Sequence, residues 1–427
     1  MARALTALAL ALALAAGCGG AGPAGEGASS SLQFLVFGEP EELRAYRDII
    51  TAFREVEAGV EVQLVEASDR SDLIARLSTS IAGGNPPDVF LLNYRFYGQF
   101  AAKGALEPVA ERLDASEAFE PEDFYEEALE AFRWKGEQMC LPQNVSSLVV
   151  YYNRTLFGEE GVAEPEPGWQ WRDMVEKAKL LTLDRDGDGT VDVYGLGVEP
   201  SVIRLAPFVW SNGGELVDDL ERPTRFTLDD VGATDAMAEF FALRRVHGVI
   251  PSEEELESED DESRFLNGRA AMVLSSRRST PVFRTITDFD WDVAPLPILG
   301  RPAGILHSDA YCLTAGSDAK DAAWRFVEFA LGPEGQRIAA GTGRTVPSLK
   351  AVANSDAFLG SDAKPASSRV FLDTIPHIRR VPSISTWPEI EDATAGIFEV
   401  AMYDDVPPAV IAQQVDEATR ALFARAE

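Results

Sequence analysis

Residues 32–93 run from LQFLVFG (32–38) to PPDVFLLN (86–93), and this stretch decides the class of fold. Both ends contain short apolar runs typical of buried strands, and residues 60–66 alternate apolar and polar side chains as a half-buried strand does. Between these strands, apolar residues recur at helical spacing over 41–56 and 72–81. The order strand–helix–strand–helix–strand predicts a parallel α/β unit with right-handed crossovers.

The rest of the chain continues the alternation of strands and helices. An apolar strand is expected over 148–152, and another where FLNGRAAMVL (265–274) ends. Helical periodicity predicts helices over residues 171–183, 234–246, 321–331, 388–402 and 409–424. The acidic run SEEELESEDDES (252–263) is predicted to be a solvated loop or the start of a helix. A length of 427 residues implies two domains, at roughly 100–200 residues each.

The first eighteen residues, MARALTALALALALAAGC, have the layout of a signal peptide. A Cys directly after the small residues 15–17 resembles the lipobox of bacterial lipoproteins, although Ala15 stands where Leu is usual. We therefore expect a signal peptide over 1–17, a lipid on Cys18, and a flexible Gly/Ala/Ser-rich tether over 18–31. The mature protein would be held at the outer face of the cell membrane or in the periplasm. The alternative is an ordinary secreted protein in which Cys18 is incidental.

Composition and missing motifs exclude several classes of function. The chain has 70 acidic and 38 basic residues and a formal net charge of −32, which argues against nucleic-acid binding. It contains no HExxH, CxxC, GxSxG or GxxxxGK[ST] motif, so zincin, thiol-redox, serine-hydrolase and P-loop functions lack their defining groups. Cys140 and Cys312 form one disulfide or stay as two buried thiols, and the spacing leaves both alternatives open.

The run DRDGDGTVDVYG (184–195) has the oxygen-rich spacing that calcium requires. Carboxylates stand at its positions 1, 3, 5 and 9, and Gly189 at position 6 allows a sharp turn. The predicted ligands are Asp184, Asp186, Asp188, the backbone carbonyl of Thr190, and Asp192. The run resembles an EF-hand loop but has Gly195 where a bidentate Glu is usual, so we expect a structural calcium site and not a sensor. The alternative is a solvated Asp/Gly turn.

The order of segments over nearly the whole chain resembles the extracellular solute-binding proteins of ABC importers, in the family-1 branch that takes up sugars. The segments that carry the resemblance are PPDVFLLNYRFYGQFAAKGALEPV, CLPQNVSSLVVYYNRTLF, WQWRDMVEKAKLLTLDRDGDGTVDVYGLG, WSNGGELVDD, FLNGRAAMVL, AYCLTAGSDAKDAAWRFVEFALGPEGQ and TGRTVPS. Each segment alone is weak evidence for the family. The stronger evidence is that all seven occur in the order expected for the family.

The resemblance implies an α/β fold of two lobes, periplasmic-binding-protein-like and of type II, with three crossovers at the hinge and a ligand cleft between the lobes. The crossings are expected near residues 141–144, 297–304 and 347–354. Lobe 1 would hold 32–142 plus 305–348, and lobe 2 would hold 143–304 plus 349–427. Closure of the lobes on a carbohydrate would let the protein dock on a membrane permease, as a monomer and without covalent chemistry.

The same resemblance, with the rule that ligands meet strand ends and crossings, gives the candidate ligand contacts. Aromatic rings would stack on sugar faces, and planar polar groups would pair with hydroxyls. The candidates are Glu39, Asn93, Tyr94, Gln143, Asn144, Ser146, Trp210, Asn212, Arg278, Ser308, Asp309, Arg344 and Trp387.

One departure from the family pattern opens a second ligand class. After the AAMVL strand the family usually offers a small residue and then a stacking aromatic, whereas this chain has Arg277 and Arg278. A guanidinium can stack on a ring or pair with an anion. A neutral oligosaccharide is therefore the first expectation, and an anionic solute such as a uronate sugar or glycerol phosphate is the second. A secreted carbohydrate-active enzyme is the alternative of another class, but no acid/base pair stands out.

Overall fold

The computed structural model describes residues 30–360 and 363–426, and its larger sheet has five strands. In chain order these strands are β1 (Ser30–Val36), β2 (Val60–Glu66), β3 (Val89–Asn93), β6 (Cys140–Pro142) and β11 (Asp309–Leu313). They lie in the order β2–β1–β3–β11–β6. Strands β1, β2 and β3 are parallel, as the sequence predicts, and β11 runs antiparallel between β3 and β6.

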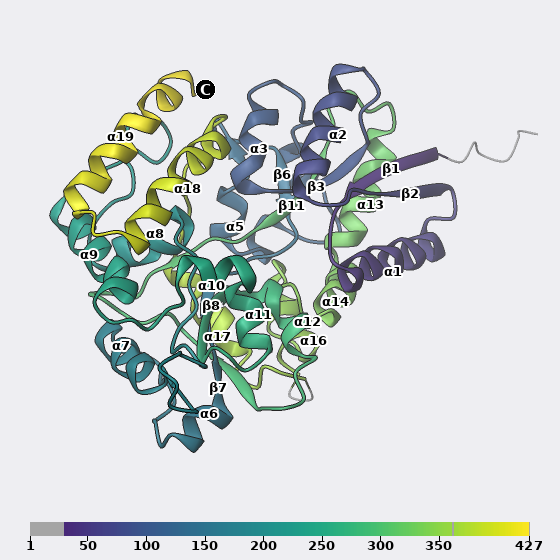
Figure 1. Cartoon of the computed structure of the whole chain (residues 1–427). Coiled ribbons are helices and arrows are strands. Elements are labelled where there is room, and N and C mark those ends of the chain that lie inside the picture. The colour runs from purple at the N-terminus through teal and green to yellow at the C-terminus, as the bar shows by residue number, and fades with distance from the viewer. Residues whose placement is uncertain (1–29, 361–362, 427) are drawn as a thin grey trace, which may run out of the picture.

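Four helices pack around this sheet, in the purple-to-blue and light-green parts of Figure 1. They are α1 (Pro40–Val56), α2 (Arg70–Ala82), α13 (Lys320–Leu331) and α14 (Pro333–Gly341). The Asp69 carboxylate accepts a hydrogen bond from the Asp72 backbone N–H at 2.9 Å, which caps α2. Phe53 of α1 meets Phe326 of α13 edge-on, with ring centroids 5.4 Å apart. These contacts join segments that lie far apart in the sequence into one lobe.

The second sheet has three antiparallel strands, β7 (Leu148–Asn153), β8 (Met272–Ser276) and β9 (Trp291–Ala294), in the order β8–β7–β9. Every residue of β7 is buried, which explains its unbroken apolar sequence. The long helices of this half are α7 (Trp171–Leu180), α8 (Val202–Ser211), α9 (Val231–Arg245), α18 (Trp387–Tyr403) and α19 (Pro408–Arg425). Helix α18 contacts α8, α9 and α19, on the left of Figure 1.

The remaining elements are short and connect these parts. The helices are α3 (Tyr94–Ala101), α4 (Ala110–Asp114), α5 (Glu126–Glu130), α6 (Arg154–Glu159), α10 (Glu253–Ser258), α11 (Asp261–Leu266), α12 (Thr280–Phe283), α15 (Lys350–Ala353), α16 (Asp356–Leu359) and α17 (Arg369–Asp373). The two-residue strands are β4 (Arg133–Trp134), β5 (Glu137–Gln138), β10 (Gly304–Ile305) and β12 (Ile378–Arg379), and single 3₁₀ turns span Pro121–Asp123, Arg277–Ser279 and Ile375–His377.

The chain passes between the two halves three times, and the three segments lie side by side. The first pass is in the middle: the Ser146 backbone N–H donates to the His307 carbonyl at 3.0 Å, and that of Val145 donates to the Val346 carbonyl at 3.0 Å. The second and third passes therefore flank the first. The predicted α/β fold of two lobes with a type II, three-crossover hinge is confirmed.

Residues 350–359 lie against the first lobe, whereas the predicted second lobe begins at residue 349. Helices α15 and α16 contact α14, and Leu349 and Val352 belong to the same buried apolar cluster as Phe34 and Phe53. Burial of Leu349 and Val352 holds the start of the segment in the first lobe, whereas Ala353 and Phe358 belong to the other large buried cluster, which also contains residues of β7 and β8.

Cys140 and Cys312 form a disulfide. The two residues face each other across the antiparallel pair β6–β11, with Cα atoms 4.5 Å apart. This spacing is typical of a non-hydrogen-bonded pair, where side chains are closest. Of the two alternatives left open by the sequence, the structure has the disulfide, and it joins the strand that leads into the first pass to the strand that follows the second.

The predicted signal peptide, Cys18 and the tether up to residue 29 lie outside the described residues. Ser30 and Ser31, predicted to end the tether, instead begin β1 and pair with Val60 and Glu61 of β2. Within residues 30–360 and 363–426, no helix combines the length and the apolar character that crossing a membrane requires.

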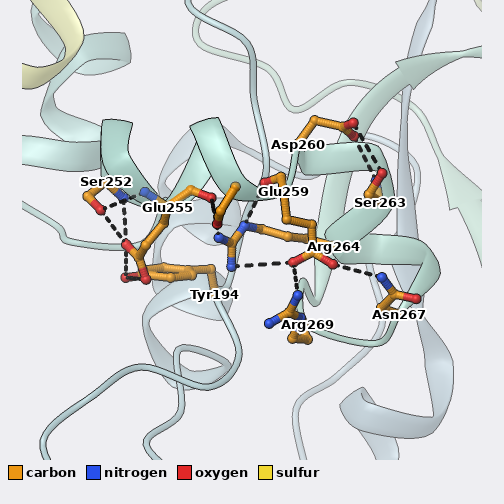
Figure 2. Close-up of polar contacts among 10 residues, drawn as sticks. Tyr194, Ser252, Glu255, Glu259, Asp260, Ser263, Arg264, Asn267 and Arg269 are labelled. Atoms are coloured by element: carbon orange, nitrogen blue, oxygen red, sulfur yellow. Dashed lines mark hydrogen bonds and ion pairs between the residues drawn. The ribbon is translucent and has the colours of Figure 1, made fainter.

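The acidic run 252–263 forms two short helices, α10 and α11, which a polar network fixes to the second lobe (Figure 2). The Glu255 carboxylate accepts from the Ser252 backbone N–H at 2.8 Å and from the Tyr194 hydroxyl at 2.9 Å. Glu259 accepts from Asn267 at 2.7 Å, forms an ion pair with Arg269 and lies 3.8 Å from the buried Arg264. The run therefore starts a helix, and its charges take part in specific contacts.

Replacing Glu259 by Gln is expected to lower the free energy of unfolding by about 1–3 kcal/mol at pH 7, because charge-assisted hydrogen bonds are lost. Burial raises the pKa of this carboxyl, but the bonds from Arg269 and Asn267 outweigh it, so the folded pKa lies below its usual value. The stabilisation is therefore present above the unfolded pKa and is lost as the pH falls through the folded pKa. Denaturant titrations at pH 7 and pH 3 measure this. The exposed Glu257→Gln is the control, and an equal loss at both pH values would contradict the prediction.

Candidate ligand-binding cleft

A cleft of about 610 Å³ lies where the three passes meet the ends of the sheets. Its walls come from the loop after β1, the ends of β3 and β8, the first and second passes, and helices α8 and α18. Both lobes therefore contribute to one cavity, and its volume is within the range typical of small-molecule sites.

Seven predicted contact residues line this cleft, and they come from both lobes. They are Glu39, Asn93, Asn144, Ser146, Arg278, Asp309 and Arg344. The Asn144 side-chain oxygen accepts from the Asp309 backbone N–H at 3.0 Å, which ties the first pass to the start of β11. These residues, which were predicted because they stand at strand ends and crossings, thus lie together in the structure. Their contact with a ligand stays a prediction.

The two tryptophans predicted to stack on a sugar ring do not line the cleft. Trp387 is 0% exposed, donates from Nε1 to Glu391, and packs on Phe226 with ring centroids 6.0 Å apart. Trp210 is 2% exposed, and the Arg379 guanidinium covers one face of it at 4.9 Å. Both indoles belong to the hydrophobic core, because neighbouring side chains cover the ring faces on which a sugar would have to stack.

The other four predicted residues outside the cleft lining already have partners within the protein. Ser308 Oγ donates to the Asn144 carbonyl at 2.6 Å, and Asn212 Nδ2 donates to the Gly232 carbonyl at 2.9 Å. Gln143 is buried on the first pass: its backbone carbonyl accepts from Gln336 Nε2 at 2.8 Å, while its side-chain Oε1 has no hydrogen-bond partner among the described residues. The Tyr94 hydroxyl accepts from the Val381 backbone N–H at 3.4 Å. These groups shape the hinge and the cleft floor.

The structure adds lining residues that the sequence did not indicate. They are mainly Phe37, Glu42, Arg70, Arg95, Phe96, Arg204, His307 and Glu391, and Arg277, noted in the sequence beside Arg278, lines the cleft too. Arg95 and Phe96 directly follow the predicted Asn93 and Tyr94. The sequence therefore identified the correct segment, but it did not show which side chains of α3 face the cleft. Among the described residues, the Phe and Tyr rings that line the cleft are Phe37, Tyr46 and Phe96, all from the first lobe.

Ion pairs hold several of the cleft's charges. Arg344 Nε lies 2.6 Å from Glu42 Oε2, and Tyr46 donates to the other Glu42 oxygen at 2.8 Å. Burial raises the pKa of Glu42, while Arg344 opposes that shift. Arg95 of α3 pairs with Glu391 of α18, so this pair crosses from one lobe to the other.

The two adjacent arginines after β8 have different surroundings. Arg278 pairs with Glu262 at 2.6 Å, and its side chain is half exposed. Arg277 is 1% exposed and lies between the rings of Phe358 and Phe371, at 4.8 and 4.9 Å. It donates from Nε to the Gly343 carbonyl at 2.6 Å, and burial lowers its pKa to about 10. Arg277 therefore fastens β8 to the segment after α14.

The predicted calcium loop brings three carboxylates together at the surface. Oxygens of Asp184, Asp186 and Asp188 lie within 4.8 Å of one another. Asp184 accepts from the backbone N–H groups of Gly187 and Gly189 at 2.8 and 2.9 Å, and Gly189 has φ +92°.

Of two further positions of this loop, Asp192 keeps the position-9 carboxylate of the EF-hand pattern, and Gly195 departs from the pattern. The Asp192 carboxylate accepts from the Arg185 backbone N–H at 2.7 Å and so closes the loop. Gly195 stands where an EF-hand has Glu, because a Cβ there would lie 1.9 Å from the Ala178 carbonyl oxygen. The donor set of hard oxygens fits calcium better than a soft metal.

Comparisons with known proteins agree with this architecture. Residues 38–337 match the family model described as bacterial extracellular solute-binding protein. The chain is 26% identical over 308 residues to the maltotriose-binding protein of Pyrococcus abyssi, covering 69% of this chain and 61% of that relative. It is 22% identical over 377 residues to the galactooligosaccharide-binding protein of Bacillus subtilis, covering 85% and 84%.

A solved structure shares the fold. The substrate-binding protein Lmo0181 of Listeria monocytogenes, in complex with cycloalternan, superposes with a TM-score of 0.83 at 24% identity. The match covers 92% of this chain and 99% of that protein. The chain therefore belongs to the bacterial extracellular solute-binding protein family, which confirms the prediction of a binding protein over that of a secreted enzyme.

Proposed function

We propose that this protein is the substrate-binding component of an ABC importer, and that it captures a carbohydrate in the cleft between its lobes. The observation that carries the proposal is the cleft itself: about 610 Å³, built from both lobes, beside a hinge of three adjacent passes. Relatives whose names refer to maltotriose and to galactooligosaccharide support carbohydrate as the ligand class.

Three contacts across the cleft support closure as the mechanism. Arg95 pairs with Glu391, Arg277 donates to the Gly343 carbonyl, and Arg344 lies 3.5 Å from the Arg278 carbonyl. Each joins a first-lobe group to a second-lobe group. A ligand that adds further contacts between the lobes stabilises the closed form and shifts the population toward it. The closed form then docks on the permease.

The lining offers the groups that a carbohydrate needs. Phe37 and Phe96 are half-buried rings that can cover an apolar sugar face. Asn93, Asn144 and Asp309 supply side-chain oxygens and amides for hydroxyl groups. No lining group has to perform covalent chemistry, so the ligand leaves unchanged.

A thermal-shift screen with mono- and oligosaccharides, followed by calorimetry on the hits, tests the proposal. At a ligand concentration of 100 Kd, a hit should add roughly 2.7 kcal/mol to the free energy of unfolding. Chromatography of the recovered ligand should return it intact. If no carbohydrate stabilises the protein, or if the sugar is consumed, the proposal fails.

We also propose that the loop 184–192 binds calcium as a structural ion. Asp184, Asp186, Asp188 and Asp192 with the Thr190 carbonyl would hold the ion, which would offset the repulsion among the clustered carboxylates. After chelation, adding calcium is expected to raise the melting temperature of the wild type but not of Asp186→Asn. The exposed Asp235→Asn is the control, because it removes an equal charge from helix α9, outside the loop. An unchanged wild-type melting temperature would refute the site.

The family consists of extracellular proteins, which indicates that the protein is exported. We propose that a lipid on Cys18 then holds it at the membrane. We also propose that it is a monomer. Cys18→Ser is expected to move the protein from the membrane fraction to the soluble fraction. An unchanged distribution between the two fractions would contradict lipid anchoring, and a dimer mass in gel filtration with light scattering would contradict the monomer.

A further inference from the structure

Arg70 of α2 is a partly buried cleft arginine without an ion-pair partner among the described residues, whereas buried Arg277, which also lacks one, donates to the Gly343 carbonyl. The Arg70 guanidinium lies between the rings of Phe37 and Phe96, at 5.5 and 5.2 Å, and lines the cleft. Among the described residues, no carboxylate lies within ion-pair distance of it, and its Nε is shielded from solvent without a hydrogen-bond partner. Shielding a guanidinium nitrogen from water without giving it a partner is unfavourable, so the free protein leaves this donor unsatisfied.

Two further lining groups have unused donors. Arg204 is 7% exposed, its Nε has no partner, and its nearest carboxylate is the largely exposed Glu199 at 3.4 Å. His307 Nε2 is likewise shielded and has no partner in the part of the chain that the structure describes. Burial, and then the charges of Arg204, Arg95, Arg278 and Arg70, lower the pKa of His307, so its imidazole is neutral at pH 7 and can donate from Nε2.

The remaining charges of the cleft do not supply the missing partner. Arg95, Arg278 and Arg344 each have their own carboxylate. Glu39, Asp309 and Asp392 line the cleft without an ion-pair partner among the residues described, and they stay available to accept from hydroxyl groups. Asp309 acts on Arg70 through space, but it lies beyond ion-pair distance. The unused N–H donors of Arg70, Arg204 and His307 could therefore be satisfied by a hydrogen-bond acceptor on the ligand.

We propose that Arg70, Arg204 and His307 form a receptor for an oxyanion carried by the ligand. The inference rests on the proposed carbohydrate function and narrows it to acidic carbohydrates. A carboxylate of a uronate and a phosphate monoester share the required chemistry, because each offers several oxygens to two guanidinium groups and one imidazole N–H. Sugar hydroxyls would then meet Asn93, Asn144 and Asp309.

Calorimetry with matched pairs tests the receptor. The probes are galacturonate against galactose, glucose 1-phosphate against glucose, and glycerol 3-phosphate against glycerol. In the wild type, at least one acidic member should bind at least about tenfold more tightly than its neutral partner, and added salt should reduce that preference. Comparing the galacturonate pair with the two phosphate pairs shows whether the receptor prefers a carboxylate or a phosphate monoester.

The variants locate the effect. Arg70→Gln and Arg204→Gln should each remove most of the preference for the acidic member, while Arg70→Lys should retain part of it. Arg76→Gln is the control, since Arg76 lies on the same helix α2 but is half exposed and paired with Asp72. Melting temperatures of the ligand-free variants verify folding.

Two results would overturn the inference. If neutral members bind as tightly as acidic ones, or if Arg70→Gln weakens both equally, the receptor is wrong while the carbohydrate function stands. If no member of any pair binds and the wider sugar screen is also negative, the proposed function fails and this inference fails with it.

Discussion

Replacing both Cys140 and Cys312 by serine is expected to lower the free energy of unfolding by about 3–5 kcal/mol. The disulfide joins residues separated by 172 positions, so its loss releases a long loop in the unfolded chain. That loop contains all of residues 143–308, which make up most of the second lobe. Guanidinium denaturation followed by circular dichroism measures the change as a lower midpoint for the variant.

Ligand binding provides the control for this prediction. The bond lies within the first-lobe sheet, between β6 and β11, and neither cysteine lines the cleft. The serine variant should therefore bind the same ligand with unchanged affinity at temperatures where it is folded. An unchanged denaturation midpoint would mean that the disulfide contributes nothing to stability.

Replacing Trp387 by Ala is expected to lower the free energy of unfolding by about 3–5 kcal/mol, because a fully buried indole leaves a large cavity. The ring packs on Phe226, and its Nε1 holds Glu391, which in turn pairs with Arg95 across the lobes. Thermal denaturation of the ligand-free protein measures the loss.

Two further variants separate packing from ligand contact. Trp387→Phe keeps most of the ring volume and should recover a large part of the stability, while Trp134→Ala removes an indole that is only half buried and should cost less. If Trp387→Ala kept full stability but lost ligand binding, the sequence-based expectation of a stacking tryptophan would be right and its core placement wrong.

Local sequence patterns predict much of the fold. Residues 60–66 and the strand start at Val89 agree with β2 and β3, and the predicted helices 41–56 and 72–81 agree with α1 and α2 within two residues at each end. The two helices are long and periodic, and the strands are marked by alternation in β2 and by a continuous buried run in β3, so local patterns locate them. The helix bounds 388–402 and 409–424 are equally close to α18 and α19. Helix α8 was not predicted; every one of its residues is buried, and Pro207, which lacks a backbone N–H, stands inside it.

The site was predictable by segment but less so by residue. Asn93, Asn144 and Asp309 lie where strand ends and passes meet, and topology brings such positions together. Trp387 and Trp210 were predicted to line the cleft but lie in the core. The sequence shows which residues are aromatic, but it does not show which face of a helix packs against the core. Arg70 and Arg204 stand in α2 and α8, and only tertiary packing shows that they turn toward the same cavity as His307.

Small-angle X-ray scattering with and without a bound carbohydrate tests the central claim that two lobes close reversibly around a solute. The account predicts a smaller radius of gyration at saturation, and a return to the original profile once the ligand is removed by dialysis. An identical scattering profile in the free and saturated protein, with binding verified by calorimetry on the same sample, would contradict hinge closure.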